Sequence, residues 1–104
     1  MEHAGIAAAV DRWFAENQER VIGWRRHIHS HPELSYREHR TTDRLMTELE
    51  AVGLEPVRLR STGCYVDIGT GELSVALRAD IDALPIDEAT GLEFSSENPG
   101  VAHM

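Results

Sequence analysis

The sequence contains no lysine: all ten basic residues are arginine, and they face 18 aspartate and glutamate residues. The resulting formal net charge of −8 argues against binding to nucleic acids or to anionic membranes, because both require a basic surface. Only Arg25 and Arg26 stand side by side, so no basic patch gathers around a motif. Neither nucleic acid nor membrane is therefore expected as a partner.

Cysteine and long apolar runs are also scarce. Cys64 is the only cysteine, which excludes an intrachain disulfide and a zinc cluster built from cysteines. No apolar run approaches the roughly 18 residues of a membrane-spanning helix. Residues 1–5 lack the basic and then apolar pattern of a secretory signal. We therefore expect a cytoplasmic protein, and the 104 residues allow one small domain.

Two helices are predicted in the first half of the chain. The apolar residues that recur at helical spacing in the first of them are Ile6, Val10, Trp13, Phe14, Val21, Trp24 and Ile28. This period predicts a helix over residues 6–29, which Pro32 stops. A second helix is predicted to begin at Ser35, where Glu38 three residues later completes a capping box, and to end before Gly53.

Beyond Gly53 the apolar period changes from helical to alternating. Strands are predicted over residues 54–59, 64–68 and 73–79, with a hairpin at 69–72 joining the last two. The continuous apolar run of residues 75–77 predicts that the third strand is the most buried, covered on both faces. About 25 residues of loop then follow, which is unusual for a complete small domain. The pattern predicts an α/β fold, two helices followed by sheet strands, that is incomplete.

Two carboxylates follow the predicted third strand. Along an extended chain, Asp80 and Asp82 point to the same side, and ligands of open α/β sheets bind beyond the carboxyl ends of the strands. The pair can bind a cation or orient metal-binding histidines. Alternatively, both residues simply end the strand and cap the loop, and the spacing alone does not decide between these interpretations.

Histidines form a second cluster. His27 and His31 are four residues apart, which on a helix puts two imidazoles on one face, as in H-E-x-x-H zinc sites. However, Ile28 stands where that motif has its glutamate, and Pro32 interrupts the helix. The alternative interpretation is a helix end that carries histidines at its negative pole.

Three further residues with reactive side chains belong to no motif. His29 lies between the two spaced histidines, and the sequence assigns it no role. His103 stands alone near the end of the chain. Cys64 is expected in a strand as a small core residue without a base beside it, so nucleophilic catalysis by its thiol is not expected.

Three separated segments carry a resemblance to a known family. They are W-R-R-H-I-H-S-H-P-E-L-S-Y-R-E-H-R-T-T at 24–42, A-L-R-A-D-I-D-A-L-P-I at 76–86, and E-A-T-G-L-E-F-S-S-E-N-P-G-V-A-H at 88–103. In this order and spacing they resemble the metal-dependent amidohydrolase branch of the M20 peptidase family. That branch includes hippurate hydrolases, indole-acetyl-amino-acid hydrolases and N-acyl-amino-acid deacylases. The resemblance covers about 80 residues, from Trp24 onward.

The resemblance implies that residues 1–104 are the N-terminal portion of a zinc-peptidase-like α/β catalytic domain, ending just before the family's metal-binding C-G-H-D motif. It implies hydrolysis of the amide bond of N-acyl amino acids or related small amides, and a homodimer. The divalent metal would be zinc, manganese, cobalt or nickel, with ligands mostly outside this chain, so the chain alone is expected to be inactive.

The resemblance also suggests which residues belong to the catalytic site. Asp82 is carried over as a catalytic-site residue. Asp80 is carried over with a site-shaping role, because it stands where other branches have a metal-binding histidine. No residue of the chain is assigned as a metal ligand. The alternative to an enzyme fragment is a short non-catalytic binding module derived from this family.

Overall fold

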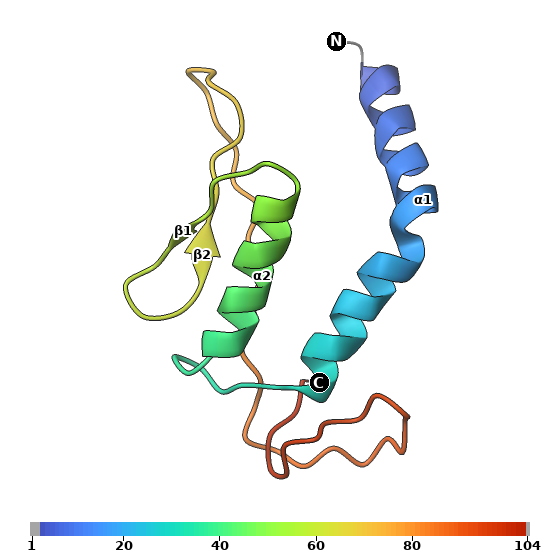
Figure 1. Ribbon diagram of the computed structural model, residues 1–104, viewed down its shortest axis with the longest axis vertical. Helices are drawn as coiled ribbons and strands as arrows, with labels where there is room; N and C mark the ends of the chain where they lie inside the picture. Colours follow the sequence, from blue (N-terminus) through green and yellow to red (C-terminus); the bar gives the residue numbers. More distant parts are fainter. Residues whose placement is uncertain (1–2, 104) are drawn as a thin grey trace.

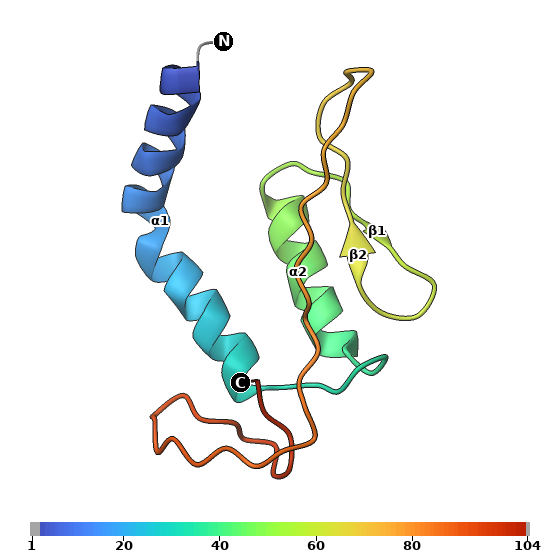
Figure 2. The same cartoon turned by 180° about the vertical axis from the view of Figure 1, so that it is seen from behind.

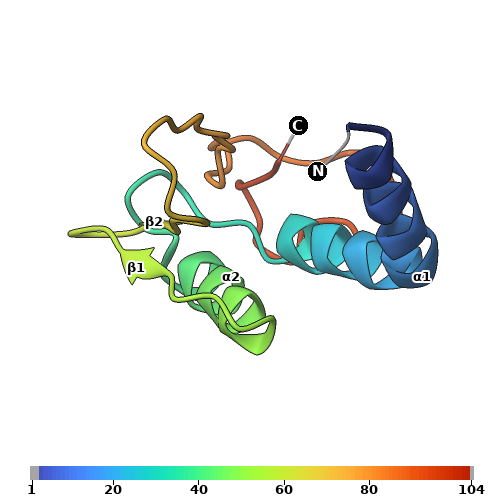
Figure 3. The same ribbon diagram turned by 90° about the horizontal axis from the view of Figure 1, so that it is seen from above.

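The computed structural model describes residues 3–103, which fold as two helices and a small sheet. The elements in chain order are α1 (His3–Ser30), α2 (His39–Ala51), β1 (Val57–Arg58) and β2 (Cys64–Tyr65). The two strands pair antiparallel, and they lie on the side of α2 that faces away from α1 (Figures 1 and 3). Within the described residues, no helix has both the length and the apolarity needed to cross a membrane.

Helix α1 follows the predicted apolar period and ends at Ser30, two residues before Pro32. Its N-terminal half nevertheless stands apart from the rest of the chain (Figures 1 and 2). Large apolar side chains of that half, Trp13 and Phe14 among them, are exposed. The periodicity therefore predicted the helix correctly, while the partner that such a stripe normally packs against is not supplied by the described residues.

Helix α2 begins three residues later than the sequence predicted, with Glu38 and not Ser35 at the N-cap position. The expected capping box at Ser35 does not form, because Tyr36 adopts a left-handed conformation with φ of 64°, which a helix cannot include. The cap comes from farther upstream. Glu33 accepts hydrogen bonds from the backbone N–H groups of Arg40 at 3.2 Å and Thr41 at 2.6 Å. A carboxylate at this position satisfies free amides and opposes the positive pole of the helix.

This cap gives a prediction for stability. We expect Glu33→Ala to lower the free energy of unfolding by about 1 to 2 kcal/mol, the usual scale for the loss of a helix cap. Ser35→Ala is the matched control and should change it by less than about 0.5 kcal/mol, because Ser35 is exposed. Urea unfolding followed by circular dichroism measures both. A larger loss of stability for Ser35→Ala than for Glu33→Ala would contradict the Glu33 cap and support the capping box at Ser35.

The sheet is smaller than predicted. The predicted strands over 54–59 and 64–68 form only as β1 and β2, with Val57 opposite Tyr65 and Arg58 opposite Cys64. Cys64 lies in a strand as expected and is partly buried. The hairpin predicted at 69–72 does not form among residues 3–103: the chain reverses direction in this region (Figure 2), but no bonded strands flank the reversal.

The prediction of a buried third strand over 73–79 is wrong for this chain. The segment forms no strand, and Leu73, Val75 and Leu77 are 95%, 98% and 102% exposed. The physical reason is that an extended segment becomes a strand only when another strand accepts its hydrogen bonds. The described residues supply neither that strand nor a layer to cover its apolar side chains.

The core lies where the 31–38 connection meets the C-terminal loops. The most buried residues include Pro32, Thr42, Ala83 and Ala102. An isolated parallel bridge ties Leu34 to Ala83, and an antiparallel bridge ties Leu84 to Ala102. These bridges tie the region after Asp80, which the sequence predicted as loop, to the connection that follows α1. They hold the chain just after Asp82 and just before His103.

Candidate functional site

An open cavity of about 510 Å³ lies beside the end of α1. Its lining residues are Arg25, Ile28 and His29 of α1, Leu45 of α2, and Asp80, Ile81, Thr90 and His103 of the C-terminal loops. All three segments that resemble the amidohydrolase family therefore meet at this one cavity.

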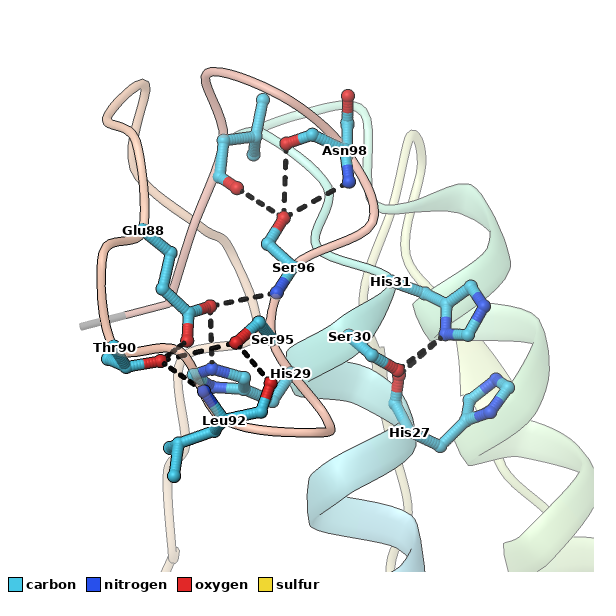
Figure 4. A network of polar contacts seen from close by, with 11 residues as sticks. His27, His29, Ser30, His31, Glu88, Thr90, Leu92, Ser95, Ser96 and Asn98 are labelled. Atoms are coloured by element: carbon cyan, nitrogen blue, oxygen red, sulfur yellow. Dashed lines mark hydrogen bonds and ion pairs between the residues drawn. The ribbon is translucent and has the colours of Figure 1, made fainter.

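Glu88 holds one of these lining residues, His29, in place. The Nε2 atom of His29 lies 2.9 Å from Oε1 of Glu88, to which the ring N–H donates. The same carboxylate accepts hydrogen bonds from the Thr90 hydroxyl and, at 2.8 Å, from the backbone N–H of Ser96 (Figure 4). The edge of Phe94 packs against the His29 ring with centroids 5.7 Å apart. The imidazole is thus fixed by a carboxylate and an aromatic ring.

The surroundings of Glu88 stabilise its charged form. Its side chain is 2% exposed, yet its pKa is lowered from 4.5 to about 2. The largest cause is the hydrogen bond from Thr90, followed by that from the Ser96 backbone; burial opposes both, and His29 adds a smaller lowering. Hydrogen bonds to a carboxylate favour its ionised state, so Glu88 is ionised at neutral pH.

This lowered pKa predicts an acid-sensitive fold. A carboxylate with a lowered pKa in the folded state contributes stability above its unfolded pKa, and that stability is lost as the pH falls toward the folded value. The thermal unfolding midpoint should therefore fall between pH 4.5 and about 2. We expect Glu88→Gln to flatten this decline and to lower the midpoint at neutral pH. Glu55→Gln, at an exposed residue, is the control. A decline of the same size in Glu88→Gln would contradict the assignment.

His103 lies across the cavity from His29, with ring centroids 6.4 Å apart. Its Nε2 atom is buried and has no hydrogen-bond partner among the described residues. Burial lowers the pKa of His103, the charge of His29 lowers it further, and the charge of Asp82 opposes both. These effects together favour the neutral imidazole, which is the form that binds metals.

The two predicted site residues lie near this histidine in different ways. Asp80 lines the cavity with His103, and it forms an exposed ion pair with Arg78 at 3.1 Å. Asp82 is partly buried, and its charge acts on the pKa of His103. The structure therefore brings both carboxylates to the His103 side of the chain. Their roles in catalysis are taken up below as a proposal.

The cavity has donors suited to a divalent metal but too few of them. An imidazole nitrogen without a partner and nearby carboxylates are the donors that zinc uses, and a zinc site needs three or four of them converging on one point. Among residues 3–103, no group of three or more His, Cys, Asp or Glu side chains converges in this way. The donors of this chain alone do not fit a complete metal site.

The histidine pair predicted on one helix face lies outside this cavity. His27 and His31 stack with ring centroids 4.3 Å apart, on the side of α1 turned away from His29 (Figure 4). His31 is already engaged at both ring nitrogens: Nδ1 lies 2.9 Å from the His27 carbonyl oxygen, and Nε2 lies 2.7 Å from Glu97. Ligation of a metal by His31 would break one of these contacts.

Sequence reasoning missed Glu88 and the role of His29. The two residues are 59 positions apart, so no local spacing connects them. The available signal was their membership in two of the three family-like segments, which indicates a shared site but not a contact.

Comparisons with known proteins identify relatives of this chain. The chain matches no family model. It is 43% identical over 98 residues to the N-acyl-L-amino acid amidohydrolase of Geobacillus stearothermophilus, covering 90% of this chain and 26% of that protein. A solved structure from Bacillus subtilis, a dinuclear metal-binding peptidase of the M20 family, superposes with a TM-score of 0.74 at 41% identity. That match covers 82% of this chain and 25% of the solved chain.

One relative has a name of another kind. A Rhodococcus jostii protein named as a glutamate–cysteine ligase is 50% identical over 90 residues, covering 84% of this chain. The matched stretch is only 11% of that protein, which leaves ample length elsewhere for a ligase. Its name therefore says little about the matched part, whereas the amidohydrolase and the peptidase match over about twice that share. The chain belongs to the M20 family of metal-dependent amidohydrolases and peptidases, and it spans about a quarter of the length of the two relatives named as such.

Proposed function

We propose that this chain is the N-terminal portion of the catalytic domain of a metal-dependent amidohydrolase that cleaves the amide bond of N-acyl amino acids. The observation that carries the proposal is the convergence of all three family-like segments on the cavity of about 510 Å³. The identity to an N-acyl-L-amino acid amidohydrolase supports the substrate class. Because the chain spans about a quarter of the length of such proteins, the proposed activity belongs to a longer protein of which this chain is a part.

The residues of this chain supply part of the chemistry. A metal held at this cavity would supply a Lewis acid for the scissile carbonyl. The groups of this chain that could hold or orient it are the neutral imidazole of His103 and the carboxylates of Asp80 and Asp82. Asp82 acts as a positioning residue through its charge on His103, and Asp80 shapes the cavity wall. The remaining metal ligands and the general base come from sequence outside residues 1–104.

The proposal is tested with two chains. One is the 104-residue chain. The other, here named the extended chain, is the same sequence followed by the part of the Geobacillus amidohydrolase beyond its matched segment. We expect the extended chain to hydrolyse hippurate or acetyl amino acids with added zinc, manganese or cobalt. The 104-residue chain should not exceed the background rate, because it lacks a complete metal site.

Two outcomes would contradict the proposal. Turnover by the 104-residue chain would mean that the site is complete without further sequence. An extended chain that is folded by circular dichroism and binds metal, yet turns over no N-acyl amino acid, would favour a non-catalytic binding module.

A further inference from the structure

A second, smaller pocket of about 240 Å³ lies between the end of α1 and the start of α2. Its lining residues are His27, Ile28, His31, Arg40, Thr41 and Arg44. The stacked histidines that line it, His27 and His31, point away from His29 and Glu88 (Figure 4). Neither the proposed hydrolysis nor the family resemblance gives this pocket a role.

Both arginines of the pocket have donors to spare. Among the described residues, the Arg40 side chain takes part in no hydrogen bond or ion pair, although its backbone N–H contacts Glu33. Arg44 forms one weak ion pair, 3.8 Å from Glu48, and Glu48 is already paired with Arg20 at 3.0 Å. The Nε atom of Arg44 is buried without a hydrogen-bond partner. A buried donor without a partner is costly, so the Arg44 guanidinium has hydrogen-bonding capacity that no described residue uses.

The nearby acidic groups Glu97 and Glu33 are bonded to other residues and do not pair with the side chain of Arg40 or Arg44. Glu97 is taken up by His31 at 2.7 Å. Glu33 is taken up by the cap of α2, where its oxygens accept from two backbone N–H groups and the Thr41 hydroxyl. Within residues 3–103, neither guanidinium group therefore has a close ion-pair partner, in a chain whose formal net charge is −8.

The pKa of His27 is consistent with this excess of positive charge. Burial lowers it most, and the charges of Arg44 and His31 lower it further, while Glu97 opposes them only in part. A cation in this pocket would meet the same repulsion. Since both nitrogens of His31 already have partners, the geometry also disfavours the metal site that the i, i+4 spacing suggested.

We propose that this pocket binds a phosphate-type oxyanion. Arginine guanidinium groups bind phosphate through paired N–H donors, and here two of them meet histidines around one hollow. A tetrahedral anion offers oxygens in several directions, which suits two guanidinium groups one turn apart on α2 better than the two oxygens of a carboxylate. This inference goes beyond the proposed amide hydrolysis and does not depend on it.

Calorimetric titration of the 104-residue chain tests the proposal. Inorganic phosphate, methyl phosphate as a simple phosphomonoester, and acetate are compared at constant ionic strength maintained with chloride. We expect saturable binding of phosphate or methyl phosphate, with acetate weaker by about tenfold or more, the scale of one or two charge-assisted hydrogen bonds. The tighter of the two phosphates identifies free phosphate or a phosphomonoester as the natural form. Absence of saturation, or acetate binding as tightly, would overturn the proposal.

A matched pair of variants locates the site. Arg44→Gln should weaken phosphate binding about tenfold. Arg20→Gln removes the same charge and also a partner of Glu48, but it lies outside the pocket and should change binding by less than about twofold. Equal losses in the two variants would show a non-specific charge effect and refute the site.

A measurement on the unchanged chain covers the case in which Arg44→Gln does not fold. The ring proton signals of His27 and His31 should move with added phosphate, while those of His29 and His103 in the other cavity should not. If the His27 and His31 signals stay in place, the proposal fails.

Discussion

Replacing Asp82 by alanine in the extended chain is expected to reduce metal affinity or kcat/KM about 10- to 100-fold, the usual scale for a group that orients a metal ligand. Asp82 is partly buried, and its negative charge acts on His103, whose Nε2 atom has no other partner. Burial and the charge of His29 both lower the pKa of His103, and the charge of Asp82 is the effect that opposes them.

The controls for this substitution separate a site role from a structural one. Asp67→Ala removes a carboxylate at an exposed position and should leave hydrolysis unchanged. The pH profile of kcat/KM provides a second readout, because loss of the Asp82 charge should lower the pKa of His103 further. Wild-type turnover and an unshifted pH profile in Asp82→Ala would contradict a role in the site. They would support the alternative that Asp82 only ends the apolar segment and caps the loop.

Leu77→Asp is expected to leave the stability of the 104-residue chain nearly unchanged and to destabilise the extended chain. In the 104-residue chain the side chain is fully exposed, so the free energy of unfolding should change by less than about 0.5 kcal/mol. In the extended chain we expect this apolar segment to be covered as a strand, as its continuous apolar run indicates. A buried, unpaired carboxylate there should cost about 3 kcal/mol or more.

Urea unfolding of both chains measures this difference, and Leu77→Ala serves as the size control. Leu77→Ala should also be silent in the short chain and destabilising in the extended one, by about 2 to 5 kcal/mol for a buried leucine. If Leu77→Asp is equally harmless in both chains, the segment over 73–79 is not a buried strand of the longer protein.

Local sequence patterns predicted the parts of this fold that depend on neighbouring residues. The apolar period and Pro32 were sufficient for α1, because helical hydrogen bonds form within the segment itself. The start of α2 was predicted wrongly because its cap is Glu33, which reaches the helix across a left-handed turn at Tyr36. No short motif encodes a cap that is eight positions from the amide it satisfies.

Long-range pairing limited the remaining predictions. The 73–79 segment has the composition of a buried strand, but the described residues supply no strand to pair with it. Similarly, Asp80 and Asp82 were singled out because they follow that apolar run, whereas the contact between His29 and Glu88 spans 59 positions and left no local trace. Only the three family-like segments, taken together, indicated that these residues share a site.

The most direct test of the central claim, that this chain carries one side of a metal site and not a whole one, is a calorimetric titration with zinc. The extended chain should bind zinc stoichiometrically and tightly, as expected for a relative of a dinuclear metal-binding peptidase. The 104-residue chain should bind it weakly or not at all, because a strong zinc site needs three or four converging ligands and residues 3–103 bring together fewer. A stoichiometric zinc site in the 104-residue chain with a dissociation constant of about 1 μM or tighter would contradict the account, and it would make His27 and His31 candidate ligands again.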